Sequence, residues 1–285
     1  MTHTNFVSVD LKGGLGNQLF QIFALLSYCI TNRVEPALSD SIGGGHRTVV
    51  YWDSIFARLR RMLVLPRTPG LMYVEPAFHY TQLPEYNNIS KPFTLNGYFQ
   101  SYKYFESNEA EIMAILDIKH PPRHDGTVSM HFRIGDYAAI QDSHPVMTVD
   151  YYMAALTRMV DVTGRSDWTV MYFCEDDDIA TVRPMIRRME HMFSGMRFAR
   201  ADPGEDWEQM MQMSACEHSI IANSTFSWWG ARIGDSIVRT NVIGGPGAEP
   251  PKRFTLYPER WFGSKMRDKN TDDLFPPEWI CIGLD

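Results

Sequence analysis

A histidine, an arginine and an aspartate lie close together in the segment His131 to Tyr137, at positions His131, Arg133 and Asp136. The segment begins at the carboxyl end of a predicted strand, the edge of an open α/β sheet where ligands bind. Alternation along an extended chain sends His131 and Arg133 to one side. An arginine can donate two charge-assisted hydrogen bonds to a diphosphate, and Asp136 or His131 can accept a proton. The alternative is an ion pair between Arg133 and Asp136 that serves only the structure.

A glycine-rich segment, Gly13 to Gln18, lies between another predicted strand and the helix that follows it. Glycines such as Gly14 and Gly16 let backbone amides approach an anion at the positive end of a helix. Asn17 and Gln18 add polar side chains at the helix entrance. The segment therefore predicts a site for a polar ligand, with a simple tight turn as the alternative.

Neither of two known nucleotide-binding loops matches this segment fully. It is not a Walker loop, because no Gly-Lys-Ser/Thr follows. Gly14 and Gly16 fit a dinucleotide fingerprint, and Glu35 follows at a spacing that suits a ribose contact, but Leu19 occupies the third glycine position. A nicotinamide-dependent oxidoreductase remains an alternative on these residues.

Short polar side chains also follow a third predicted strand, at Asn223, Ser224 and Thr225, with Phe226 next. Backbone amides and hydroxyl groups at a helix start can donate to an anion. The alternative is ordinary capping of the helix by Thr225. The tryptophans at positions 228 and 229 are expected in the core.

The composition of the chain narrows the classes of protein and of binding partner to consider. The chain has 285 residues, 44% of them apolar, and a net charge of −7 with a pI near 5.7. These values predict a compact globular protein and give no general attraction to nucleic acid. The four cysteines show no zinc-binding spacing and are expected as reduced thiols. No leader or membrane-spanning stretch is evident, so we expect a cytoplasmic protein.

The predicted elements alternate between strand and helix on both sides of a polar, proline-containing stretch at 119–126. We therefore expect an α/β protein with two domains, 1–122 and 123–285, and a C-terminal tail that can pack back on the first. The expected strands are Phe6–Leu11, Val128–Phe132, Trp168–Cys174 and Ser219–Ala222. The expected helices are Leu19–Ile30, Tyr151–Val162 capped by Asp150, Ile179–Met189, Trp207–Cys216 and Phe226–Ile233.

Four motifs together resemble the α-1,2-fucosyltransferase family. They are GGLGNQLFQ at 13–21, GYFQSYKYF at 97–105, HFRIGDY at 131–137 and IIANSTFSWWGA at 220–231, in the order that the family has. The resemblance implies a GT-B architecture of two Rossmann-like domains that face each other across a cleft. It also implies GDP-fucose as the donor substrate, inversion at the anomeric carbon, and no metal or other cofactor.

The resemblance also implies roles for residues. The first domain would take the acceptor, with Asn17 and Gln18 near the reacting carbon, and the second would bind the GDP-sugar. Arg133 matches the family's arginine on the diphosphate, and the segment 224–226 matches the one that wraps phosphates and base. Two departures stand out: Ile134 replaces a second basic residue, and Cys-Glu-Asp-Asp-Asp at 174–178 replaces the family's Ser-Asp-Asp.

The expected reaction is transfer of fucose to a glycan, with the 2-hydroxyl of a terminal galactose as the acceptor group and residues 43–82 shaping acceptor choice. The glycan can be a free oligosaccharide or a lipid-linked one, and peripheral membrane association is left open. One alternative is a metal-dependent transferase that uses the D-x-D pattern at Asp176 to Asp178. Another is a sugar-nucleotide or glycan-binding protein without catalysis.

Overall fold

The computed structural model describes residues 6–40, 51–64, 70–86, 91–119, 121–240 and 251–284. The chain divides into two compact units: Met1–Lys119 with Lys269–Pro276, and His120–Asp268 with Pro277–Asp285. Gly43 to His46 and other parts of the segment expected to shape acceptor choice lie outside the described residues.

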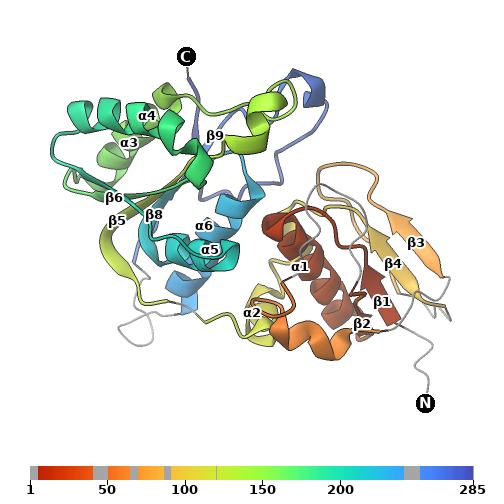
Figure 1. Ribbon diagram of the computed structural model, residues 1–285. Coiled ribbons are helices and arrows are strands. Elements are labelled where there is room, and N and C mark those ends of the chain that lie inside the picture. Colours follow the sequence, from red (N-terminus) through yellow and green to blue (C-terminus); the bar gives the residue numbers. More distant parts are fainter. Residues whose placement is uncertain are drawn as a thin grey trace. The chain divides into compact units, whose positions relative to one another are not determined.

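The first unit is built on a parallel sheet with the strand order β2-β1-β4-β3 (Figure 1). Its strands are β1 (Phe6–Val9), β2 (Glu35–Ala37), β3 (Leu71–Val74) and β4 (Phe93–Asn96), and its helices are α1 (Leu15–Asn32) and α2 (Glu109–Leu116), with the short turns η1 (Ala57–Met62) and η2 (Tyr102–Tyr104). Most residues of α1 are buried, and many of them are leucine, isoleucine or phenylalanine. The helix ends where Arg33 adopts a left-handed conformation, with φ of 55°.

The second unit has a six-stranded parallel sheet with the order β10-β9-β8-β5-β6-β7. Its strands are β5 (His124–His131), β6 (Thr169–Phe173), β7 (Arg197–Arg200), β8 (Cys216–Ile220), β9 (Thr255–Pro258) and β10 (Ile280–Ile282). Its helices are α3 (Val149–Thr163), α4 (Ile179–Met192), α5 (Asp206–Ala215) and α6 (Thr225–Thr240), with the turns η3 (Gly135–Ala139), η4 (Asp176–Asp178) and η5 (Ser264–Met266). In Figure 1, α3 and α4 lie on one face of this sheet, and α5 and α6 lie on the other.

Strand β5 shows how the alternating side chains divide between these faces. Val128 and Met130 belong to a buried cluster with residues of α3 and α4, as does Phe132, whose ring lies 4.3 Å from that of Tyr152. His131 points to the opposite face and lies against Phe226 of α6. The α/β class predicted from the sequence is confirmed; the facing arrangement of two domains across a cleft stays a prediction.

Two predicted helix caps are wrong. Asp150 was expected to cap the helix that follows it, but α3 begins at Val149, and Thr148 is the capping position. Asp150 instead lies in the first turn, where a carboxylate still interacts favourably with the helix dipole. Thr225 is the first residue of α6, not its cap. The tryptophans at 228 and 229 are fully buried, as predicted.

A buried ion pair joins α6 to the segment before β9. The Nε atom of Arg253 lies 3.1 Å from Oδ1 of Asp235, and the two side chains are 4% and 9% exposed. The indole of Trp279 donates to the other carboxylate oxygen at 2.7 Å, and Arg253 donates to Ser219 Oγ at 2.7 Å. Because both charges are desolvated, each depends on the other.

Substitution Asp235→Ala should therefore lower the free energy of unfolding by about 3–5 kcal/mol, because it leaves the Arg253 guanidinium buried without its counter-ion. The matched control is Asp167→Ala, which removes the exposed partner of Arg165 and should leave stability nearly unchanged. Urea unfolding followed by tryptophan fluorescence measures both. Equal effects of the two substitutions would contradict this assignment.

Candidate active site

Three connections meet at the carboxyl edge of the sheet in the second unit. The chain leaves β5 towards Arg133 and Asp136, leaves β6 towards Glu175, and leaves β8 towards the start of α6. These three strands are neighbours, and their pairs are parallel, so they end on the same edge. Open α/β sheets bind ligands at this edge.

Arg133 lies at the centre of this edge, with its side chain 18% exposed. Its Nη2 donates to Asp136 Oδ1 at 2.6 Å, and its Nη1 donates to Glu175 Oε1 at 2.7 Å. The ion pair with Asp136 that the sequence left open is thus present, and Glu175 adds a second. Two carboxylates fix the guanidinium on the edge where a diphosphate would be expected.

The ring of Tyr137 packs against the guanidinium of Arg133. The guanidinium carbon of Arg133 lies 5.2 Å from the centre of the Tyr137 ring, within cation–π range. The phenol donates to the backbone oxygen of Asn223 at 3.2 Å, and its ring stacks on His144 with a centroid distance of 4.9 Å. Burial raises the pKa of Tyr137 to about 12, so the hydroxyl stays protonated and keeps donating.

His131 is nearly enclosed, with 8% of its surface exposed and its ring 5.6 Å from that of Phe226. Within the described part of the chain, its Nδ1 atom has no hydrogen-bond partner. Burial and the neighbouring Arg133 charge lower the pKa of His131 to about 3. The imidazole is therefore neutral near pH 7.

Asn223 joins three loops at the end of β8. Its Nδ2 atom donates to the backbone oxygens of Pro145 and Trp261, at 2.9 and 3.1 Å, and the residue is 1% exposed. This places Asn223 in a supporting position; a direct contact with substrate stays a prediction. Ser224 Oγ accepts from the Phe226 amide at 3.4 Å at the start of α6.

In the first unit, the glycine-rich turn leads into α1 as predicted. Gly13 has φ of +78°, and a Cβ atom there would lie 2.4 Å from Asn17 Nδ2, so both the conformation and the space require glycine. Gly14 precedes α1, and Gly16 is buried in its first turn. Gln18 is fully buried and donates to the Gly13 oxygen at 2.8 Å, which braces the turn from inside.

Sequence reasoning missed the partners that hold this turn. Gln100 Nε2 donates to Asn17 Oδ1 at 2.9 Å, which links the motif at 97–105 to the glycine-rich segment. Lys12 Nζ donates to Asn96 Oδ1 at 2.9 Å and lies 5.0 Å from the centre of the Tyr98 ring. Two features of the sequence could have pointed to these partners: Lys12 directly precedes the glycines, and Gln100 lies within the aromatic motif at 97–105.

The structure places Glu35 away from the glycine turn. Glu35 pairs with Phe6 at the start of β1, whereas the turn follows the end of that strand. A ribose held near Gly14 would lie at the opposite end of the strands from Glu35. This geometry argues against the dinucleotide interpretation.

The acidic residues of the D-x-D pattern have protein partners. Asp178 accepts from the Gly135 amide at 3.0 and 3.1 Å, and Asp176 pairs with Arg200. Among the residues that the structure describes, no group of three or more potential ligands is placed to hold a metal ion. Asp178 thus anchors the turn that carries Asp136.

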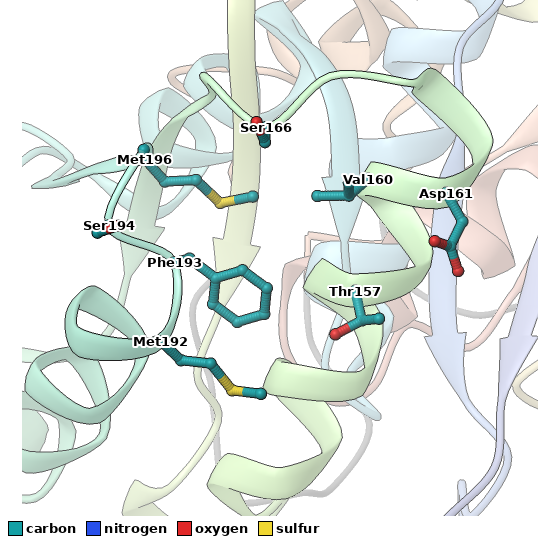
Figure 2. Close-up of a pocket in the computed structure, with 9 residues that line it drawn as sticks. Thr157, Val160, Asp161, Ser166, Met192, Phe193, Ser194 and Met196 are labelled. Carbon is teal, nitrogen blue, oxygen red and sulfur yellow. The ribbon is translucent and has the colours of Figure 1, made fainter.

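A cavity of about 310 Å³ lies at the opposite edge of the same sheet, where α3 and α4 end (Figure 2). The side chains of Met192, Phe193 and Met196 face α3 there. The residues that line this cavity include Asp161 and no lysine, arginine or histidine, so the cavity lacks the positive charge that would attract a diphosphate. The carboxyl edge is therefore the candidate site.

Comparison with known proteins identifies the family to which the chain belongs. The model of glycosyl transferase family 11 matches residues 73–243, so the chain belongs to that family. An alpha-1,2-colitosyltransferase of Escherichia coli is 24% identical over 98% of this chain and 99% of its own length. A galactoside 2-alpha-L-fucosyltransferase of Caenorhabditis elegans is 22% identical over 98% of this chain and 79% of its own. A family 9 glycosyl transferase of Veillonella parvula is 11% identical over 97% of this chain and 86% of its own, with a TM-score of 0.46.

The family resemblance predicted from the four motifs is confirmed, and the chain is a glycosyltransferase. Three of those motifs, at 97–105, 131–137 and 220–231, lie inside the matched region. None of the helices in the described part of the chain combines the length and apolar character needed to span a membrane.

The state of His131 can be tested by NMR. Its imidazole signals should not titrate between pH 5 and 8 in the folded protein, and should titrate near pH 6.5 in urea. Between about pH 6.5 and pH 3, the unfolded chain binds a proton at His131 that the folded protein does not bind. The stability that the neutral imidazole contributes above pH 6.5 is therefore lost as the pH falls towards 3. A folded-state titration near pH 6.5 would contradict the buried, neutral imidazole.

Proposed function

We propose that this protein transfers L-fucose from GDP-fucose, with inversion, to a hydroxyl of a glycan, the 2-hydroxyl of a terminal galactose. The observation that carries the proposal is the fixed guanidinium of Arg133 at the carboxyl edge of a family 11 sheet. Two relatives that match 98% of this chain have names that specify transfer to a 2-position, which supports the linkage.

Arg133 would stabilise the leaving group. As the bond to the sugar breaks, the sugar becomes oxocarbenium-like and negative charge grows on the β-phosphate. A guanidinium that is already oriented, together with the first amides of α6 after Ser224, meets that charge without reorganisation. In this proposal no metal ion is needed, and undiminished turnover in excess chelator is the expected result.

Asp136 is the proposed general base for the acceptor hydroxyl. Its side chain is 60% exposed, so an acceptor can reach it, although Arg133 shares its charge. His131 is the weaker choice, because an imidazole with a pKa of about 3 accepts a proton poorly near neutral pH. Asn17 and Gln18 of the first unit are proposed on the acceptor side, with Gln18 acting through the turn that it braces.

A second candidate donor is nucleotide-activated colitose. It is favoured by the colitosyltransferase relative, whose match covers 99% of that protein. Colitose is fucose without the 3-hydroxyl, so the two donors differ by one hydrogen-bonding group. A site that bonds this hydroxyl discriminates strongly between such sugars, whereas an apolar site does not.

Substitution Arg133→Ala should lower kcat by roughly 10²–10³, as expected for loss of a preorganised donor to a developing negative charge. Release of GDP from GDP-fucose in the presence of a galactoside acceptor measures the effect. Arg158→Ala removes an exposed arginine of α3 and serves as the control, with kcat unchanged. Near-normal turnover of a folded Arg133→Ala variant would remove this role.

Donor identity is tested by calorimetric titration of GDP-fucose, GDP-colitose, GDP-mannose and UDP-galactose. The proposal expects the tightest binding from GDP-fucose, followed by 2-O-fucosylation of a galactose-terminated oligosaccharide identified by NMR. Tighter binding and faster transfer of the colitose donor would replace fucose with the second candidate. Binding without transfer to any acceptor would identify a sugar-nucleotide-binding protein instead.

A further inference from the structure

The charge around Arg133 is negative in the protein without ligand. One guanidinium faces two carboxylates, Asp136 at 2.6 Å and Glu175 at 2.7 Å, and each terminal nitrogen donates to a different one. A diphosphate that approached this triad unchanged would meet a group of net negative charge, and one N–H of each terminal nitrogen of Arg133 already donates to a carboxylate. Departure of one carboxylate would remove both obstacles to binding of the donor.

The two carboxylates differ in how firmly they are placed. Asp136 lies three positions after Arg133 on the same turn, so keeping this pair orders little additional chain. That turn is anchored by Asp178, which accepts from the Gly135 amide. Glu175 reaches Arg133 from the connection after β6, and its side chain is 51% exposed. Both carboxylates are accessible to solvent, at 60% for Asp136 and 51% for Glu175, so the difference lies in the chain: the longer Glu175 side chain comes from a separate connection and can turn away without moving the turn that carries Arg133.

We propose that Glu175 occupies the diphosphate's place on Arg133 when no donor is bound, and gives way to the diphosphate when it arrives. Glu175 is then a determinant of donor affinity. A diphosphate engages Arg133 more strongly than a monophosphate does, so it displaces Glu175 where a monophosphate or an uncharged nucleoside gains little. The inference rests on the proposed function in one respect, that the incoming anion belongs to a nucleoside diphosphate.

The first test measures the affinity for GDP by calorimetry. Glu175→Gln should lower the Kd for GDP by about 5- to 10-fold, because it removes both the competitor for Arg133 and a negative charge next to the phosphates. The Kd for GMP should fall by less, because a monophosphate engages Arg133 less than a diphosphate does, so the ratio of the GMP Kd to the GDP Kd should increase. Glu190→Gln, an exposed glutamate on α4, removes the same charge elsewhere and should leave both Kd values unchanged.

Glu175→Asp provides a second variant that keeps the charge but shortens the reach to Arg133, and it should tighten GDP binding less than Glu175→Gln. An unchanged or higher Kd in Glu175→Gln would overturn the proposal. A higher Kd would mean that Glu175 contacts the donor or orients Arg133 for it.

Thermal unfolding separates competition from a purely structural role. Glu175→Gln should lower Tm in the absence of ligand and have no effect at saturating GDP, because the pair with Arg133 exists only in the free protein. A structural role would lower Tm equally in both states, and that result would contradict the proposal.

Inorganic pyrophosphate distinguishes failure of this inference from failure of the proposed function. If the wild-type protein binds pyrophosphate but no GDP-sugar, the proposed function fails, and a lower pyrophosphate Kd in Glu175→Gln still supports competition at Arg133. If GDP-fucose binds normally and Glu175→Gln binds neither anion more tightly, the proposed function stands and this inference fails. If neither protein binds any of these anions, both fail.

Discussion

The interaction on which the candidate site depends is the clamp of Arg133 between Asp136 and Glu175. An unrestrained arginine side chain at this position can adopt many rotamers, and most of them would not direct its N–H groups at a leaving diphosphate. Two carboxylates restrict it before substrate arrives, which is the preorganisation that electrostatic catalysis needs. The same carboxylates give the group a net negative charge, so the contacts that orient Arg133 also weaken its attraction for an anionic donor.

The clamp is held in turn by a buried polar network. Tyr137 supports the guanidinium, donates to the backbone of Asn223 and stacks on His144. Asn223 ties the loops at Pro145 and Trp261 to the end of β8. Several connections of one sheet are therefore locked together around one cation.

The sequence was most informative where local patterns dictate structure. Alternation predicted that His131 and Arg133 share one side of the chain, and in the structure His131 lies against Phe226, whereas Phe132 packs on Tyr152. A glycine-rich turn followed by apolar residues at helical spacing predicted α1. The caps were missed at Asp150 and Thr225 because several neighbouring residues can fill a capping position. The partnership of Glu175 with Arg133 could not be predicted, because it joins residues 42 positions apart through the order of the strands. The burial of Asn223 could not be predicted either, because an asparagine before a helix can cap the helix, contact a ligand or hold neighbouring loops together.

A crystal structure with GDP would show whether the diphosphate of the donor binds at Arg133. We expect β-phosphate oxygens within hydrogen-bonding distance of the Arg133 guanidinium and next to the first turn of α6, with Glu175 turned away. A nucleotide bound elsewhere, with Arg133 still paired to both carboxylates, would contradict this expectation.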